Sequence, residues 1–269
     1  MTREGGAGLP AATLLAPDEA PAVERWHQDA KAPVLLVCDH ASRLVPRALG
    51  TLGLAPALFD FHIAWDIGAA EVARLLALQL DAPLILGGYS RLVVDLNRYP
   101  DDPSSIPLAS DGIDVPGNCD LAPANRARRL DALFHPYHRA IAATLDRLLA
   151  RGHPPALVSV HSFTPMMAGK ARPWHVGVLW DRDDRIAGPL MAGLRAQGDI
   201  LVGDNEPYSA SVPKAYTVTE HAEVKGWPQV AIELRQDLVA SAAGAAEWSR
   251  RLADALGPIL ADERLYRAV

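Results

Sequence analysis

The sequence contains little cysteine, no long apolar run and no excess of basic charge, and each absence excludes a class of protein. Its 269 residues include only Cys38 and Cys119, which provide neither a disulfide framework nor the spacing of a metal site, so we expect a reducing, cytoplasmic environment. The sequence shows no signal-peptide core and no apolar run of about 18 residues, which argues against a membrane protein. A net charge of −6 argues against nucleic acid or an anionic membrane surface as the main partner.

The overall composition is that of an ordinary globular protein, with 49% hydrophobic and 22% charged residues. A chain of this length can bury one substantial core. We therefore predict one folded domain over residues 26–269, preceded by a loose N-terminal arm over residues 1–25. We find no internal repeat and no convincing domain break.

Short apolar runs alternate with segments that have helical spacing. The runs predict strands at residues 33–38, 82–86, 91–96, 155–160, 174–179 and 229–232. The helical patterns cover residues 67–80, 125–149, 182–195 and 243–256. This alternation predicts an α/β domain whose central sheet is mixed, mostly parallel, and covered by helices on both faces.

Three of the predicted strands end in His40, His161 and Glu233. Open α/β sheets bind ligands at such strand ends, and two histidines with a carboxylate form the ligand set of a catalytic zinc site. Neither the H-E-x-x-H nor the H-x-x-E spacing occurs, so the third ligand must come from elsewhere. We favour Asp66 over Asp39, because Asp39 adjoins His40 in an extended segment and should point to the opposite face. Simple roles remain open, with the histidines as packed polar residues and Asp66 as a helix N-cap.

Glu233 is the candidate general base and acid, because it follows an apolar run and should be partly buried beside the metal. The alternative is an ion pair between Glu233 and Arg235, which share one face of a strand.

The segment Ser90 to Pro100 combines apolar residues with Arg91, Asp95, Asn97 and Arg98. A net-negative protein can hold an anionic substrate only where arginines gather. Side chains alternate along a strand, so the two arginines reach one pocket only if the strand ends or bulges near Asn97. The alternative is a structural Arg/Asp network at a sheet edge.

These motifs resemble those of the N-formylglutamate amidohydrolase family, which is related more distantly to the zinc carboxypeptidases and to aspartoacylase. The resemblance spans about residues 34–239. It is carried by Asp39-His40-Ala41-Ser42, the Asp66 segment, Ser90-Arg91, Asp95-Leu96-Asn97-Arg98, Val160-His161-Ser162 and Ile232-Glu233. The segment 172–179 departs from the pattern expected of the formylglutamate enzymes.

The resemblance implies a zinc-carboxypeptidase-like fold and one Zn²⁺ per chain on His40, Asp66 and His161. It further implies that Asn97 and Arg98 grip a substrate carboxylate. The remaining implied roles are polarisation of the scissile carbonyl by Arg91 and proton transfer by Glu233. Further candidates for substrate contact are Ser162, Asn205, Tyr208, His221 and Arg235.

The expected substrate is a small anionic N-acyl amino acid such as N-formylglutamate. One alternative is a metallopeptidase or peptidoglycan amidase of the same fold, with an anionic peptide terminus at Asn97 and Arg98. The other is a non-catalytic carboxylate-binding protein whose histidines are structural.

Overall fold

The fold is built on one seven-stranded sheet, seen in a computed structural model that describes residues 13–209 and 215–267. The strand order is β1-β3-β2-β6-β11-β9-β10. The strands are β1 (Val23–Trp26), β2 (Val34–Cys38), β3 (Leu84–Gly87), β6 (Ala156–Phe163), β9 (Val176–Leu179), β10 (Val202–Asp204) and β11 (Gln229–Arg235). The central strands β3, β2, β6 and β11 are parallel, whereas β1, β9 and β10 run the opposite way.

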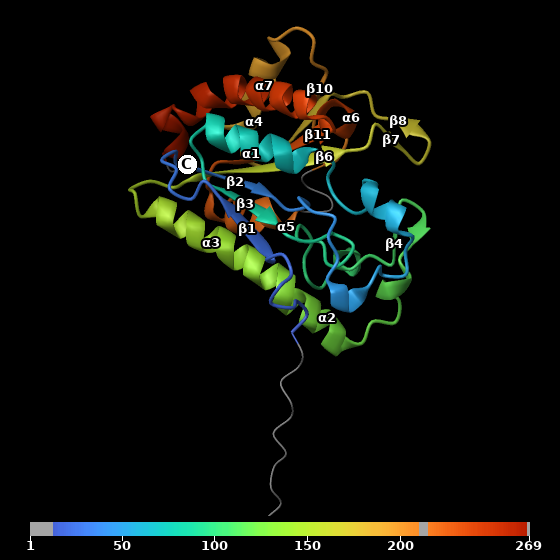
Figure 1. Cartoon of the computed structure of the whole chain (residues 1–269). Coiled ribbons are helices and arrows are strands. Elements are labelled where there is room, and N and C mark those ends of the chain that lie inside the picture. Colours follow the sequence, from blue (N-terminus) through green and yellow to red (C-terminus); the bar gives the residue numbers. More distant parts are fainter. Residues whose placement is uncertain (1–12, 210–214, 268–269) are drawn as a thin grey trace, which may run out of the picture.

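Helices cover both faces of the sheet (Figure 1). One face carries α1 (Ala69–Gln79), α4 (Ala187–Arg195), α6 (Gln236–Val239) and α7 (Ala242–Leu260). The other carries α3 (His135–Leu149) and α5 (Tyr216–His221). A π-helical turn, Leu130–Phe134, joins α2 (Pro123–Arg129) to α3. The predicted fold class is confirmed.

Short elements complete the described part of the chain. Two small hairpins pair β4 (Ala109–Ser110) with β5 (Ile113–Asp114) and β7 (Met166–Met167) with β8 (Lys170–Ala171). The 3-10 turns are Arg47–Leu49, Pro56–Asp60, Pro103–Ser105, Pro116–Asn118, Glu223–Lys225 and Glu263–Tyr266. Across the described residues, no helix has both the length and the apolar character needed to cross a bilayer.

The central strands are apolar throughout because both of their faces are buried. In β2, Val34, Leu36 and Cys38 pack into the cluster that includes α1 and α7, while Leu35 and Val37 pack into the cluster that includes α3. This is the alternation that a pleated strand imposes.

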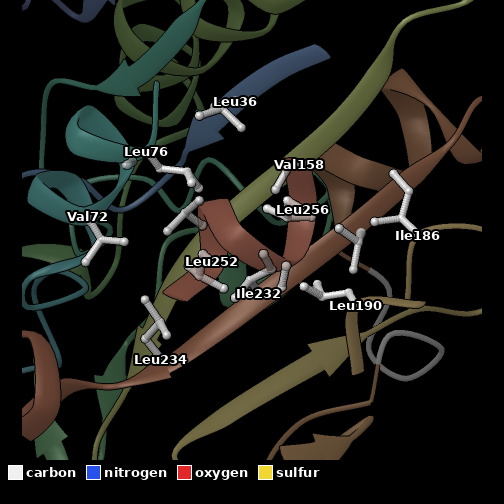
Figure 2. Packing of buried hydrophobic residues seen from close by; sticks show 14 of the residues in the cluster. Leu36, Val72, Leu76, Val158, Ile186, Leu190, Ile232, Leu234, Leu252 and Leu256 are labelled. Atoms are coloured by element: carbon white, nitrogen blue, oxygen red, sulfur yellow. The ribbon is translucent and has the colours of Figure 1, made fainter. Parts of the chain in front are cut away.

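Figure 2 shows the first of these clusters, in which residues of three neighbouring strands gather around α7. The labelled strand residues Val158 and Ile232 belong to it. Because side chains alternate, His161 and Glu233 point to the opposite face, toward α3 and α5. The parallel register places Glu233 directly beside His161.

The predicted strand at Arg91–Leu96 is wrong, because these residues form a buried loop instead. Side chains from elsewhere satisfy its backbone: Asn118 Nδ2 donates to Leu92 O, and Arg129 Nη1 donates to Val93 O. This buried apolar run needs no neighbouring strand, because hydrogen bonds from polar side chains take the place of the backbone hydrogen bonds of a sheet.

The predicted N-terminal arm, residues 1–25, differs from the structure at its C-terminal end. Residues 1–12 lie outside the described residues. Leu14 is buried, and β1 begins at Val23 and pairs antiparallel with β3. The described part of this segment is thus packed on the sheet.

Candidate active site

A cavity of about 430 Å³ opens on the α3 and α5 side of the sheet, where the central parallel strands end. His40 follows β2 by two residues, while His161 and Glu233 lie near the C-terminal ends of β6 and β11. The polar residues that line the cavity include His40, His62, Asp66, Arg91, Asn97, Arg98, His161, Ser162, Tyr208 and Glu233.

His40, Asp66 and His161 meet at the base of this cavity. The Nδ1 atoms of both histidines face one carboxylate oxygen, Asp66 Oδ2, at 3.2 Å from His40 and 2.8 Å from His161. Their candidate ligand atoms all lie within 4.8 Å of one another, and the three residues are buried. Two imidazole nitrogens and a carboxylate oxygen fit a zinc ion.

A carboxylate also holds the far nitrogen of each histidine. Asp95 Oδ1 lies 2.7 Å from His40 Nε2, and Asp39 Oδ2 lies 3.1 Å from His161 Nε2, where Ser159 also contacts the ring. Such partners fix the ring orientation and the tautomer of a metal-binding histidine. The alternation of side chains in an extended segment disfavoured Asp39 as a metal ligand. It did not predict that Asp39 contacts His161.

Neighbouring histidines, rather than burial, determine the pKa values of the carboxylates in this cluster. Burial alone would raise the pKa of Asp66, but His40 and His161 hold it below its usual range. Burial would also raise the pKa of Asp39, yet His161 brings it to about 2. The carboxylates therefore stay ionised in a buried setting because cationic or hydrogen-bonding partners surround them.

Arg91 is held between two buried carboxylates. Its Nη2 donates to Asp95 Oδ2 at 2.7 Å, and its Nη1 lies 3.6 Å from Asp66 Oδ1. Burial lowers the pKa of Arg91, but Asp95 and Asp66 outweigh it and raise the pKa overall. The cation is therefore fixed in charge and in place at the cavity wall. An Arg/Asp contact in this segment was the alternative interpretation of the sequence, whereas the contact of Asp95 with His40 was not predicted. A carboxylate inside an apolar run indicates that it has a buried partner.

Asn97 and Arg98 line the same cavity as Arg91. Asn97 Oδ1 accepts a hydrogen bond from Thr217 N at 3.0 Å, which presents its amide donor to a ligand. Arg98 Nη1 donates to Asn97 O, and among the described residues no carboxylate pairs with Arg98. In a regular strand Arg91 and Arg98 would point to opposite faces. Because the segment forms a loop instead, both side chains line the same cavity.

Glu233 lies beside His161 in the sheet and is 8% exposed. Its Oε2 is buried and has no hydrogen-bond partner among the described residues. Burial raises the pKa of Glu233 to about 7, with Asp66 acting in the same direction and both histidines and Arg91 opposing. A carboxylate with a pKa near 7 can both accept and release a proton at neutral pH.

Comparisons with known proteins agree with this arrangement. A sequence model of the N-formylglutamate amidohydrolase family matches residues 32–240. The chain belongs to this family. It is therefore a hydrolase that acts on amide bonds, and the resemblance seen in the sequence motifs is confirmed.

Solved structures extend the similarity over most of this amidohydrolase. Gene product Atu2144 from Agrobacterium tumefaciens is 38% identical, covers 92% of this chain and 98% of its own, and superposes with a TM-score of 0.89. The N-formylglutamate amidohydrolase from Ralstonia eutropha JMP134 is 17% identical, with 89% and 97% covered and a TM-score of 0.61, and shows the same fold. No match was found among curated protein sequences.

Two further residues predicted to contact substrate line the cavity of the amidohydrolase. Ser162 lies beside the cluster of His40, Asp66 and His161, and its Oγ donates to Ile67 O. Tyr208 lies at the cavity wall, and its hydroxyl accepts a hydrogen bond from Arg172 Nη1 at 2.9 Å.

Three other predicted substrate contacts are not among the lining residues. Asn205 Oδ1 accepts from a backbone N–H, and His221 lies against another buried histidine. Arg235 is paired with Asp237, so the alternative ion pair with Glu233 is not formed. Arg235 shares a strand face with Glu233 in β11, but only Glu233 lines the cavity.

Proposed function

We propose that this protein is a zinc-dependent amidohydrolase that removes an N-acyl group, formyl in the first instance, from an acidic amino acid such as glutamate. One observation supports this proposal: His40, Asp66 and His161 share a cavity with Glu233, whose Oε2 has no hydrogen-bond partner among the described residues. A hydrolase needs both a place to activate water and a base beside it.

The metal-binding group fits zinc because its three donors converge and each histidine is oriented by a second carboxylate. When bound there, Zn²⁺ would lower the pKa of water and polarise a carbonyl oxygen.

Glu233 accepts the proton of the attacking water and then delivers it to the departing amine. Its free Oε2 provides the lone pair, and its pKa of about 7 allows both transfers at neutral pH. Burial maintains this pKa by disfavouring the charged carboxylate.

Arg91 and Arg98 divide the recognition of the substrate. Arg91, anchored by Asp95, points a fixed positive charge at the oxygen on which charge develops. Arg98 has no carboxylate partner among the described residues and, with the amide of Asn97, binds the carboxylate next to the scissile bond. The cavity volume of about 430 Å³ suits a small ligand. The free thiols of Cys38 and Cys119 support action in a reducing cytoplasm.

A substrate panel tests the proposal. The purified, zinc-loaded protein is offered N-formyl-L-glutamate, N-acetyl-L-glutamate and an acidic dipeptide, and the released amine is measured together with bound zinc. We expect the N-formyl substrate to be hydrolysed best. Preference for the dipeptide would favour a peptidase, and substrate binding without turnover or bound metal would favour a carboxylate-binding protein.

A further inference from the structure

Arg172 stands beside the cavity wall, next to the base of the β7–β8 hairpin. Its backbone N–H donates to Pro165 O at 2.8 Å, which fixes the neck of the hairpin. Its guanidinium lies over two aromatic rings, with Cζ 4.8 Å from the ring centre of Tyr208 and 6.0 Å from that of Phe163. Both rings line the cavity. Arg172 is thus held at the cavity by stacking.

Among the described residues, the charge of Arg172 has no ion-pair partner of opposite sign. Its Nη1 donates to the Tyr208 hydroxyl and its Nη2 contacts Met167 Sδ. Within residues 13–209 and 215–267, no carboxylate lies within 4.0 Å of its nitrogens, whereas Arg91 has two carboxylate neighbours. In a chain of net charge −6, a positioned guanidinium without a counter-charge is a site for an anion.

The hydrogen-bonding capacity around Arg172 suits a carboxylate. A guanidinium has five N–H donors, and only two of its nitrogens are engaged here. The Tyr208 hydroxyl accepts from Arg172, so its own hydrogen remains available to donate. Together the two side chains can offer at least two donors to one carboxylate group.

The position along β6 indicates which carboxylate is bound. Phe163 lies two residues beyond His161 on the same strand face, about 7 Å farther along. A group over Phe163 is therefore about one short side chain away from His161, in the cavity that Arg98 also lines. We infer that Arg172, with the Tyr208 hydroxyl, binds a second, distal carboxylate of the substrate and so selects dicarboxylic N-acyl amino acids. This inference rests on the proposed function for the reaction itself.

The test compares two substrates that differ only at the distal group, N-formyl-L-glutamate and N-formyl-L-glutamine. For Arg172→Gln we expect kcat/KM to fall about 10- to 100-fold with the glutamate substrate, mainly through KM, because charge-assisted hydrogen bonds are lost. The glutamine substrate should be hydrolysed as by the wild type. Lys170→Gln is the matched control, since it removes the same charge from an exposed position of the same hairpin and should change neither value.

Two kinetic outcomes overturn the inference: an equal loss with both substrates, which marks a structural role, or no loss with either. Binding provides a second measurement that needs no turnover. Calorimetry on the zinc-loaded protein compares glutarate, a dicarboxylate, with butyrate, and we expect the wild type to prefer glutarate and Arg172→Gln to lose that preference. If the wild type hydrolyses no N-formyl amino acid, the proposed function fails, and the glutarate preference alone decides the role of Arg172. A wild type without that preference refutes the inference.

Discussion

Replacing Glu233 with glutamine should stabilise the metal-free protein while it abolishes catalysis. Glu233 is 8% exposed and its Oε2 lacks a hydrogen-bond partner among the described residues. Burial raises its pKa from 4.5 to about 7. At 1.36 kcal/mol per pH unit, ionisation of this residue costs the folded state about 3 kcal/mol.

The sign of the pH dependence follows from proton binding. Between pH 4.5 and about 7 the folded state holds a proton at Glu233 that the unfolded chain releases, so the free energy of unfolding falls as pH rises through this window. Glutamine has no proton to release. The stability advantage of Glu233→Gln should therefore be small near pH 5 and approach about 3 kcal/mol at about pH 8.

Urea denaturation of wild type and variant at both pH values measures this advantage. The metal is removed first, because a bound cation would lower the pKa of Glu233. Glu71→Gln, at an exposed position of α1, is the matched control and should show little change. With zinc restored, Glu233→Gln should lose about 10²- to 10⁴-fold in kcat. A variant that is less stable than the wild type at about pH 8, or one with wild-type kcat, would refute the reasoning.

Three further predictions concern the remaining groups. His40→Ala and His161→Ala should each lose bound zinc, measured by metal analysis, while circular dichroism shows the fold retained; full activity of metal-free wild type would contradict this. Arg98→Lys should raise KM for an acidic N-acyl amino acid, because the two-pronged geometry is lost, whereas Arg91→Lys should lower kcat; identical defects would contradict that division. Burial lowers the pKa of His221 to about 4 from 6.5, so the unfolded chain binds more protons in between and stability should fall as pH drops through that window. Urea titration of His221→Gln should show a weaker dependence, and an unchanged one would disprove it.

The ends of the central strands could be predicted from the sequence, because a strand that is buried on both faces is a nearly continuous apolar run. The runs before His40, His161 and Glu233 are buried and almost wholly apolar, with Asp39, Ser159 and Gln229 as their polar residues. The side chains of His40, His161 and Glu233 line the cavity, and parallel pairing of the strands brings them together. Local pattern and tertiary position agree here, so the convergence of His40 and His161 could be predicted from the sequence.

The loop from residue 90 to 100 could not be predicted because distant residues hold it. Asn118 and Arg129 satisfy the carbonyls of Leu92 and Val93. Nothing within the segment distinguishes a carbonyl that will meet a strand from one that will meet a side chain. The hydrophobic pattern of a segment indicates that it is buried. Which group hydrogen-bonds to its backbone depends on residues that are distant in the sequence.

Asp95 shows why the loop conformation matters for the site. Its Oδ1 accepts from Asn97 N at 2.9 Å and lies 2.7 Å from His40 Nε2, and its Oδ2 accepts from Arg91 at 2.7 Å. In a regular strand Arg91 and Arg98 would face opposite sides of the sheet. The turn that Asp95 closes onto Asn97 brings both arginines to one cavity, and the same carboxylate contacts His40, one of the three residues that could hold a metal. In the proposed mechanism, the one carboxylate of Asp95 would therefore support the metal site, the arginine that polarises the carbonyl and the residues that bind the carboxylate, and a regular strand at this segment would not allow that.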